Sequence, residues 1–430
     1  MATIQVREHE TLKIGSRDPV HRVLSDEQAS ALRRLEPTLP AGVLRWGHKQ
    51  VKFRQFCGVI SLGADTIEIL PKIHGRETTP GVFREILIKM LYAARELTPS
   101  LHGGADIDLQ RHHLLDIFIN HFCGLLFSEV HKGLIKVYVE REENLPVVKG
   151  RLLIGQQLKV NLVHQERVCC QFDELQEDNL YNQAIKATLR VLFGIARASR
   201  LRQQLTELLF IFDAVQDVRV TAQDVRRLPR NRLVSRFEEI IRLCEWFLSG
   251  VSPDVVVGRS PTAALLFDMN RVFEAYVAAV MRKVTRSAGG KCKAQGPQRF
   301  LGRELTSGKH VFLLKPDLTV ADSNGEMTLI ADTKWKMLDA ADSKYGVSQA
   351  DVYQMLAYGT QYRCRRLALI YPAHSASGTT QPAVRVREGD YQIEVWDVDL
   401  AGVAGIGPSV ASQLASRLRG TDESSLSLAR

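Results

Sequence analysis

The sequence lacks long apolar runs and paired cysteine motifs. No stretch approaches the ~18 apolar residues needed to cross a bilayer, and the N-terminal segment MATIQVREHE has no apolar core of a secretion signal. The seven cysteines are an odd number without any C-x-x-C pair, which argues against a disulfide framework. We therefore expect reduced, mostly buried thiols in a cytoplasmic protein that has no membrane partner.

Several catalytic and nucleotide-binding motifs are also missing. The sequence has no G-x-x-x-x-G-K-[ST] phosphate loop, so we expect no nucleotide site of its own. It has no G-x-S-x-G elbow, which leaves acyl transfer without support. The pairs His112-His113 and Cys169-Cys170 have no partner motif at zinc spacing, so we interpret them as structural.

Basic residues are in excess, with a formal net charge of +9 at pH 7, which favours a polyanionic partner. Residues 275 to 303 contain no acidic residue and seven basic ones: Arg282, Lys283, Arg286, Lys291, Lys293, Arg299 and Arg303. This stretch is suited to following phosphates, and a solvated helix face with a loop explains it equally well.

The length of 430 residues predicts several domains in an α+β multidomain protein. The segment Phe53 to Ile73 is typical of a β-hairpin, and helical periodicity follows from Val82 to about Lys132. Gly, Ser and Pro cluster in Ser249 to Pro261, which marks a boundary. We expect four parts: a β-rich and helical partner-binding region (1–175), a helical connector (176–254), an α/β domain (255–400), and a C-terminal helix with a frayed tail (401–430).

The segment Val311 to Met337 predicts a β-hairpin around Asn324-Gly325, a pair that favours a two-residue type I′ turn. Counting outward from this turn places Asp317 directly opposite Asp332. One predicted face is apolar and should be buried: Phe312, Leu314, Leu318, Val320, Met327, Leu329, Ala331 and Trp335. The other face is polar: Lys315, Asp317, Thr319, Asp332, Lys334 and Lys336.

The two facing carboxylates of this hairpin, with side-chain bases only ~5 Å apart, repel each other unless a cation neutralises them. Mg²⁺ binds few protein carboxylates and shares its shell with substrate phosphates, so it fits this role, with Mn²⁺ as an alternative. Lys334 lies on the same face as Asp332 and is placed to stabilise charge on a phosphate. This pattern indicates phosphodiester hydrolysis, although an exposed face that mixes Asp and Lys for solubility has the same spacing.

Two predicted helices flank the hairpin. The first runs from Pro261 to about Thr285 and carries Glu274 at the edge of its apolar stripe, as a candidate metal ligand. The second runs from Asp351 to a Gly359 cap, with Gln354 and Tyr358 one turn apart on one face. Both side chains are placed to contact DNA or to brace the site, and the segment RRLALIYP then predicts another strand.

This arrangement of Glu274, Pro316-Asp317, Asp332-Thr333-Lys334 and the Gln354 helix resembles the PD-(D/E)XK nuclease fold. The resemblance implies that Asp317 and Asp332 bind the metal, that Glu274 is an auxiliary ligand, and that Lys334 assists catalysis. It also implies that the Gln-x-x-x-Tyr helix marks a subgroup. From the polar face of the hairpin we further expect Lys315 and Lys336 as auxiliary DNA-contacting residues, with Gln354 and Tyr358.

Four segments together resemble the McrC family, the nuclease subunits of McrBC restriction systems. They are Gly58 to Ile73 with its ILPKI ending, Gly133 to Arg151, Phe172 to Asn182, and Pro316 to Lys336. The resemblance implies a partner, a McrB-like AAA+ GTPase hexamer that recognises modified cytosine and translocates DNA. It also implies that the region before Ser249 inserts into the motor ring and stimulates its GTPase.

The leading hypothesis is a Mg²⁺-dependent endonuclease that cleaves double-stranded, methylated DNA with a partner motor. Two alternatives remain: a repair or recombination nuclease of the same fold that acts with a helicase, and a non-catalytic adaptor of the motor. Residues Val403 to Ala411 match a helix-hairpin-helix DNA clamp, and a Gly-capped turn into a final helix explains them with less chain.

Overall fold

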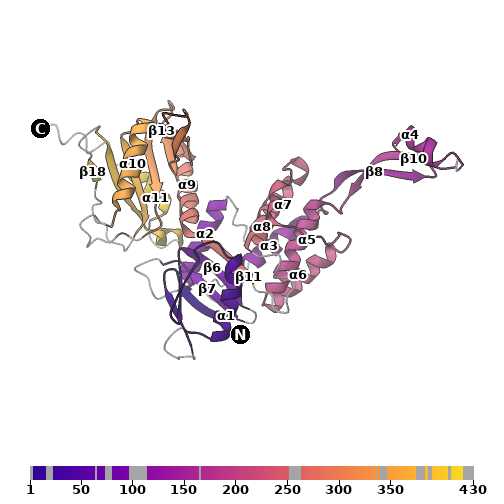
Figure 1. Cartoon of the computed structure of the whole chain (residues 1–430), viewed down its shortest axis with the longest axis horizontal. Coiled ribbons are helices and arrows are strands. Elements are labelled where there is room, and N and C mark those ends of the chain that lie inside the picture. Colours follow the sequence, from indigo (N-terminus) through magenta and orange to yellow (C-terminus); the bar gives the residue numbers. More distant parts are fainter. Residues whose placement is uncertain are drawn as a thin grey trace.

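The computed structural model has a mixed α+β fold, as predicted, built from several bodies and a long projecting arm (Figure 1). It describes residues 3–15, 23–62, 65–72, 80–95, 114–163, 166–250, 263–336, 338, 346–373, 383–385, 390–404 and 408–419. Within these ranges, no helix is both long enough and apolar enough to span a bilayer. Most of the predicted boundary segment Ser249 to Pro261, namely residues 251–261, lies outside the described ranges.

Two four-stranded sheets form the N-terminal body. The first has the order β1 (Thr3–Arg7), β7 (Asp65–Leu70), β6 (Phe56–Leu62), β11 (Ala263–Asp268), and the second has the order β3 (Val23–Leu24), β2 (Thr11–Ile14), β5 (Gln50–Phe53), β4 (Leu44–Gly47). Helix α1 (Asp26–Leu35) starts at a Ser25 capping box and packs its apolar side on this body. The hairpin predicted between Phe53 and Ile73 is confirmed by the antiparallel pairing of β6 with β7.

Strand β11 corrects the prediction of a helix that starts at Pro261. Residues 263–268 pair antiparallel with β6, and only then does helix α9 (Met269–Ser287) begin, capped by the Asp268 side chain. The apolar run AALLF suits a buried strand as well as a helix, and the free edge of β6 decides between them. The chain therefore returns to the N-terminal sheet immediately before it enters the C-terminal body.

The central body is helical, as predicted. Its helices are α3 (Leu114–Val130), α5 (Leu180–Ile195), α6 (Ser199–Ile211), α7 (Ala222–Arg227) and α8 (Glu238–Gly250), whereas α2 (Pro80–Arg95) lies outside this body and contacts α9 and β7. Helices α3, α5, α6 and α8 contact one another, and the rings of Phe122 and Phe247 meet edge to face at 5.7 Å. All seven cysteines are free, and six of them are buried, which confirms the expected burial of most thiols.

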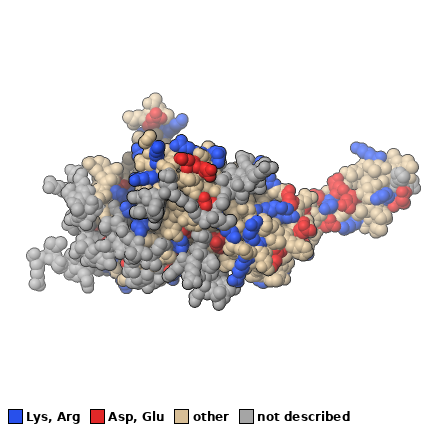
Figure 2. Space-filling model, turned by 90° about the horizontal axis from the view of Figure 1, so that it is seen from below, with Lys and Arg blue, Asp and Glu red and all other residues tan. Residues whose placement is uncertain are grey.

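A narrow arm projects from the helical body (Figure 1). It consists of β8 (Val137–Leu145) and β10 (Val168–Gln176), paired antiparallel, with β9 (Arg151–Leu152) and α4 (Ile154–Val160) at the far end. No residue of α4 is buried. Acidic side chains gather along the narrow part of the arm (Figure 2).

A six-stranded mixed sheet forms the C-terminal body. Its order is β12 (Lys291–Ala294), β15 (Leu318–Ala321), β16 (Met327–Thr333), β17 (Arg366–Pro372), β19 (Gln392–Val398), β18 (Ala383–Arg385), with β16, β17 and β19 parallel. Helix α9 contacts β12 and β16, and α11 (Val410–Arg419) contacts α9 and β19. Helix α10 (Gln349–Tyr362) contacts β16 and β17 and packs on the opposite face of the sheet.

The C-terminal end has a 3-10 helix, Leu400–Ala404, before α11. The predicted final helix is confirmed. The loop at residues 405–407, on which the helix-hairpin-helix hypothesis depends, lies outside the described residues.

Candidate functional site at the open end of the sheet

Strands β15 and β16 pair in the predicted register. Leu318 lies opposite Ala331 and Val320 opposite Leu329, so one further step along each strand sets Asp317 opposite Asp332. The two acids therefore stand where β15 begins and β16 ends. This end of the sheet is the candidate site.

The turn between these strands differs from the prediction. Asp322 donates its N–H to the Glu326 carbonyl at 3.0 Å, which leaves a three-residue loop, and Gly325 has a φ of 89°. The Asp322 side chain accepts N–H bonds from Asn324 and Glu326, which favours this longer loop. A bulge between Val320 and Ala321 compensates for the extra residue and restores the predicted register.

The predicted apolar face is wrong at its first two positions, because residues 310–314 form a separate strand. Strand β14 (His310–Leu314) pairs with β13 (Arg299–Arg303), and Phe312 is 74% exposed. Pro316 has no N–H to continue the ladder, so β15 starts only at Leu318. The predicted polar face is also covered, because α10 lies across it and Thr319 is buried.

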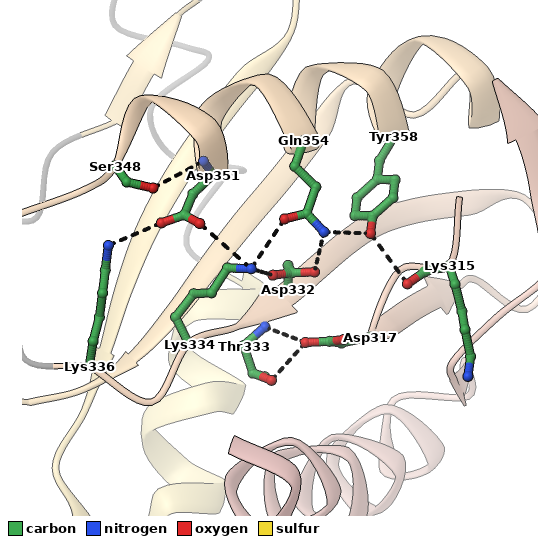
Figure 3. A network of polar contacts seen from close by, with 10 residues as sticks. All are labelled: Lys315, Asp317, Asp332, Thr333, Lys334, Lys336, Ser348, Asp351, Gln354 and Tyr358. Atoms are coloured by element: carbon green, nitrogen blue, oxygen red, sulfur yellow. Dashed lines mark hydrogen bonds and ion pairs between the residues drawn. The ribbon is translucent and has the colours of Figure 1, made fainter. Parts of the chain in front are cut away.

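Asp317 is held by the residue that follows Asp332. Its Oδ2 accepts the backbone N–H of Thr333 at 2.7 Å and the hydroxyl of Thr333 at 2.8 Å (Figure 3). These two bonds fix the direction of the Asp317 carboxylate. Threonine at the centre of Asp332-Thr333-Lys334 thus orients the acid of the neighbouring strand.

Lys334 turns back onto Asp332. Its Nζ lies 2.6 Å from Asp332 Oδ2 and donates to Gln354 Oε1 at 3.1 Å (Figure 3). Burial lowers the pKa of Lys334, but the neighbouring carboxylates of Asp332 and Asp351 outweigh it and the net pKa is raised. The amine is therefore charged and is held between the sheet and α10.

Gln354 and Tyr358 complete this network from helix α10. Gln354 Nε2 lies 3.4 Å from Asp332 Oδ1 and donates to the Tyr358 hydroxyl at 2.7 Å, and that hydroxyl lies 3.3 Å from the Lys315 carbonyl. Burial raises the pKa of Tyr358 to about 12, so its hydroxyl stays protonated. Helix α10 continues to Tyr362, with Arg363 in the left-handed cap position, which corrects the predicted end at Gly359.

Asp351 is a member of the network that the sequence analysis missed. Its carboxylate lies 3.6 Å from Lys334 Nζ and 3.1 Å from Lys336 Nζ. Its spacing of three residues to Gln354 and seven to Tyr358 places it on the same helix face, a signal that was available in the sequence. The Lys315 ammonium points away from this network (Figure 3).

Glu274 approaches the acids from α9. Its Oε1 accepts a bond from Gln295 Nε2 at 3.0 Å. Burial and the charge of Asp317 raise its pKa, and the same two causes raise the pKa of Asp332 to about 7. The negative charge of Asp317 therefore acts on both other carboxylates.

The acids fit a cation site of two carboxylates better than one of three. Among the described residues, no group of three or more His, Cys, Asp or Glu side chains lies close enough to hold a metal ion. Mg²⁺ needs only one or two protein carboxylates, because water and phosphate oxygens fill its remaining positions. The repulsion around Asp317 is of the kind that a divalent cation relieves.

Together these observations define an α+β protein with a carboxylate and lysine site at the end of a mixed sheet where β15 begins and β16 ends. Its sequence matches the family described as McrBC 5-methylcytosine restriction system component over residues 51–372, and the chain belongs to that family. No curated protein matches it.

Two solved structures from Thermococcus gammatolerans share the fold. One is a half-complex from the tetradecameric assembly of McrB AAA+ hexamers with bound McrC, with a TM-score of 0.69 and 18% identity over 97% of this chain and 99% of that chain. The other is the McrBC complex, with a TM-score of 0.51 and 21% identity over 66% of this chain and 88% of that chain. These relatives agree with the predicted resemblance to McrC.

Proposed function

We propose that this chain is the endonuclease subunit of a McrBC-type restriction system and cleaves double-stranded DNA with Mg²⁺. The observation that carries the proposal is the convergence of Asp317, Asp332 and Lys334 at one end of the sheet, braced by α10. A sheet flanked by α9 and α10, with the acids on two adjacent strands, supports a PD-(D/E)XK nuclease domain.

In this mechanism Asp317 and Asp332 would hold Mg²⁺ or Mn²⁺, and Glu274, which forms no three-carboxylate group with them here, would add its negative charge from α9. A bound metal of this kind makes hydroxide available near neutral pH and polarises a phosphoryl oxygen. Thr333 keeps Asp317 directed at the site, and Asp332 and Gln354 hold the Lys334 ammonium. Lys334 stabilises the charge that develops on the scissile phosphate.

We further propose that the arm and the region before Ser249 engage a hexameric AAA+ GTPase and stimulate it. The arm exposes large apolar side chains that its own fold leaves uncovered: Tyr138, Val147, Val148, Ile154, Leu158, Val160, Leu162 and Val163. Exposed apolar clusters of this extent are typical of protein interfaces. The bound McrC in the McrB assembly from T. gammatolerans supports the same partner class.

A cleavage assay tests the catalytic proposal. The full chain, a purified AAA+ partner, GTP and Mg²⁺ are incubated with methylated or unmethylated DNA, and wild type is compared with Asp332→Asn. We expect methylation-dependent cutting that Asp332→Asn reduces by at least about 100-fold. Asp390→Asn is the matched control, because Asp390 is an exposed acid of the same body and should leave cutting unchanged.

Two further measurements separate the alternatives. Partner binding and GTP hydrolysis should survive Asp332→Asn, because the arm lies far from the site (Figure 1). Unchanged cutting by Asp332→Asn excludes this site, and an absence of cutting by wild type with intact GTPase stimulation favours the adaptor. Equal cutting of unmethylated DNA with a helicase partner favours the repair nuclease.

A further inference from the structure

A two-stranded hairpin is connected at both ends to residues of the candidate site. Strands β13 and β14 span residues 299–314, and both connections to this hairpin pass through the site. On the entering side, Gln295 donates to Glu274 Oε1 and to the Asp317 carbonyl. On the leaving side, only Lys315 and Pro316 separate Leu314 from Asp317.

The base of this hairpin is fixed to helix α10. The Tyr362 hydroxyl lies 2.5 Å from the Pro297 carbonyl and 3.0 Å from the Leu314 carbonyl. Gln361 donates to the Phe300 carbonyl at 2.8 Å, and Arg299 donates to the Gln361 carbonyl at 2.6 Å. Because α10 also carries Gln354, the hairpin and the site are held by one rigid element.

The hairpin exposes apolar side chains that nothing in the described chain covers. The exposed fractions are Phe300 40%, Leu301 50%, Leu305 102%, Phe312 74% and Leu313 49%. Phe312 also has a φ of 58°, a strained conformation for a bulky residue, and strain of this kind is concentrated at functional sites. Residues that form part of a core would be buried, and a simple solvated turn would carry polar side chains without a strained Phe312. Neither explanation accounts for this hairpin.

Basic residues accompany these apolar side chains. Arg303 and Lys309 are exposed on the hairpin, and Lys291 and Lys293 are exposed on the edge strand β12. An open hollow of about 600 Å³, lined by Arg299 and Arg363 together with one acid, Glu326, lies where β16 starts and α10 ends, away from the catalytic acids. The exposed charged residues of the hairpin are therefore mostly basic, since Arg299, Arg303 and Lys309 stand against the single acid Glu304.

We propose that the hairpin 299–314 is a DNA-binding wedge that seats the duplex on the catalytic acids, an inference that rests on the proposed nuclease function. Arg303, Lys309 and the β12 lysines contact phosphates on either side of the scissile bond. Phe312 and Leu305 enter the minor groove and partially unstack two neighbouring base pairs, as inserted apolar side chains do in proteins that bend DNA. The charge of the surrounding surface selects a polyanion over a second copy of the chain.

Duplex binding by the full chain, measured in EDTA so that nothing is cut, tests the wedge. Fluorescence anisotropy gives the affinity, and a duplex with 2-aminopurine reports unstacking. We expect Phe312→Ala to weaken binding about tenfold and to abolish the 2-aminopurine signal, with the salt dependence unchanged. Arg303→Ala with Lys309→Ala should reduce the slope of log affinity against log salt by about 1.8.

Matched controls come from the helical body. Phe210→Ala removes an aromatic ring that is 81% exposed on α6, and Arg200→Ala with Arg232→Ala removes two exposed charges. All three changes should leave DNA affinity and its salt dependence unaltered. Asp332→Asn should bind the duplex as wild type does while it fails to cut, which separates the wedge from catalysis.

The outcome that overturns the wedge is an unchanged affinity and 2-aminopurine signal for Phe312→Ala. If Phe312→Ala instead alters only the sedimentation of the chain, the hairpin joins copies of the protein and the DNA assignment is wrong. Normal folding of Phe312→Ala is checked by its unfolding midpoint, which should match wild type because the side chain is exposed.

Discussion

Trp335 donates its indole N–H to both carboxylate oxygens of Glu8 at 2.9 Å, although 327 positions separate the two residues. Glu8 also accepts the backbone N–H of Lys72 at 2.8 Å and is only 2% exposed. The Trp335 ring lies 5.4 Å from that of Phe273 on α9. The N-terminal sheet is therefore joined to the short segment that also carries Lys334.

The buried Glu8 carboxylate predicts a pH-dependent stability. Burial raises the pKa of Glu8 from 4.5 to about 7, with the bonds from Lys72 and Trp335 acting in the opposite direction. The folded state thus binds a proton that the unfolded state has released. This contribution is fully present below pH about 4.5 and is lost as pH rises through about 7. It amounts to roughly 3 kcal/mol of unfolding free energy.

Urea unfolding between pH 5 and pH 8 measures this effect. In wild type the unfolding free energy should fall as pH rises. Glu8→Gln should remove most of this fall, so that the variant is more stable than wild type at pH 8. Glu36→Gln is the control, since Glu36 also accepts an indole bond, from Trp46, but is only half-buried. An equal pH dependence in Glu8→Gln and wild type contradicts the prediction.

Removing the donor should also destabilise the chain. Trp335→Phe keeps an aromatic ring against Phe273 but leaves Glu8 with fewer donors, which costs about 1–3 kcal/mol of unfolding free energy at pH 8. When Trp335→Phe is made in the Glu8→Gln background, the loss of unfolding free energy should be smaller, because the Gln amide carries no charge for the indole N–H to stabilise. A double-mutant cycle measures the difference, and full additivity argues against a direct coupling.

The strand register of the site was predictable because it depends on local periodicity. Leu318, Val320, Leu329 and Ala331 share one face, which excludes any shift by one residue, and a turn close to Asn324-Gly325 selects the register that sets Asp317 against Asp332. The turn was not predictable from Asn324-Gly325 alone. Asp322 adds two side-chain bonds that favour a longer loop, and a bulge absorbs the difference.

Long-range pairing explains what the sequence could not predict. The run at residues 263–268 becomes a strand only because β6 offers it an edge, which lies about 200 positions earlier in the chain. The place of Asp351 on the same helix face as Gln354 was predictable from its spacing, whereas its ion pairs with Lys334 and Lys336 were not, since those lysines come from another element. The contact between Glu8 and Trp335 leaves no local signature at all.

Gly58 should be intolerant of any side chain. Its φ is 139°, and a Cβ added there would lie 1.9 Å from the Leu265 carbonyl oxygen of β11. We expect Gly58→Ala to cost more than about 2 kcal/mol of unfolding free energy, because conformational strain and a backbone clash add. Gly325→Ala is the control, because Gly325 has a positive φ in open space and should cost only about 1 kcal/mol. Equal losses in the two variants, measured by urea unfolding, contradict a clash at β11.

Gln354 should act as a positioning residue for Lys334 rather than as a DNA ligand. Its carbonyl oxygen accepts from Lys334 Nζ, and its amide nitrogen reaches Asp332 and the Tyr358 hydroxyl. Without Gln354, Lys334 is less firmly held at the position of the scissile phosphate. We therefore expect Gln354→Ala to lower kcat for DNA cleavage about tenfold, equivalent to ~1.4 kcal/mol of transition-state stabilisation. KM should change little. Tyr358→Phe should cause a smaller loss in kcat, since it removes only the hydroxyl that holds Gln354.

The control is Gln349→Ala at the exposed start of the same helix, which should cut as wild type does. A rise in KM for Gln354→Ala with kcat unchanged would mean that the amide binds DNA directly, and the bracing role would be wrong.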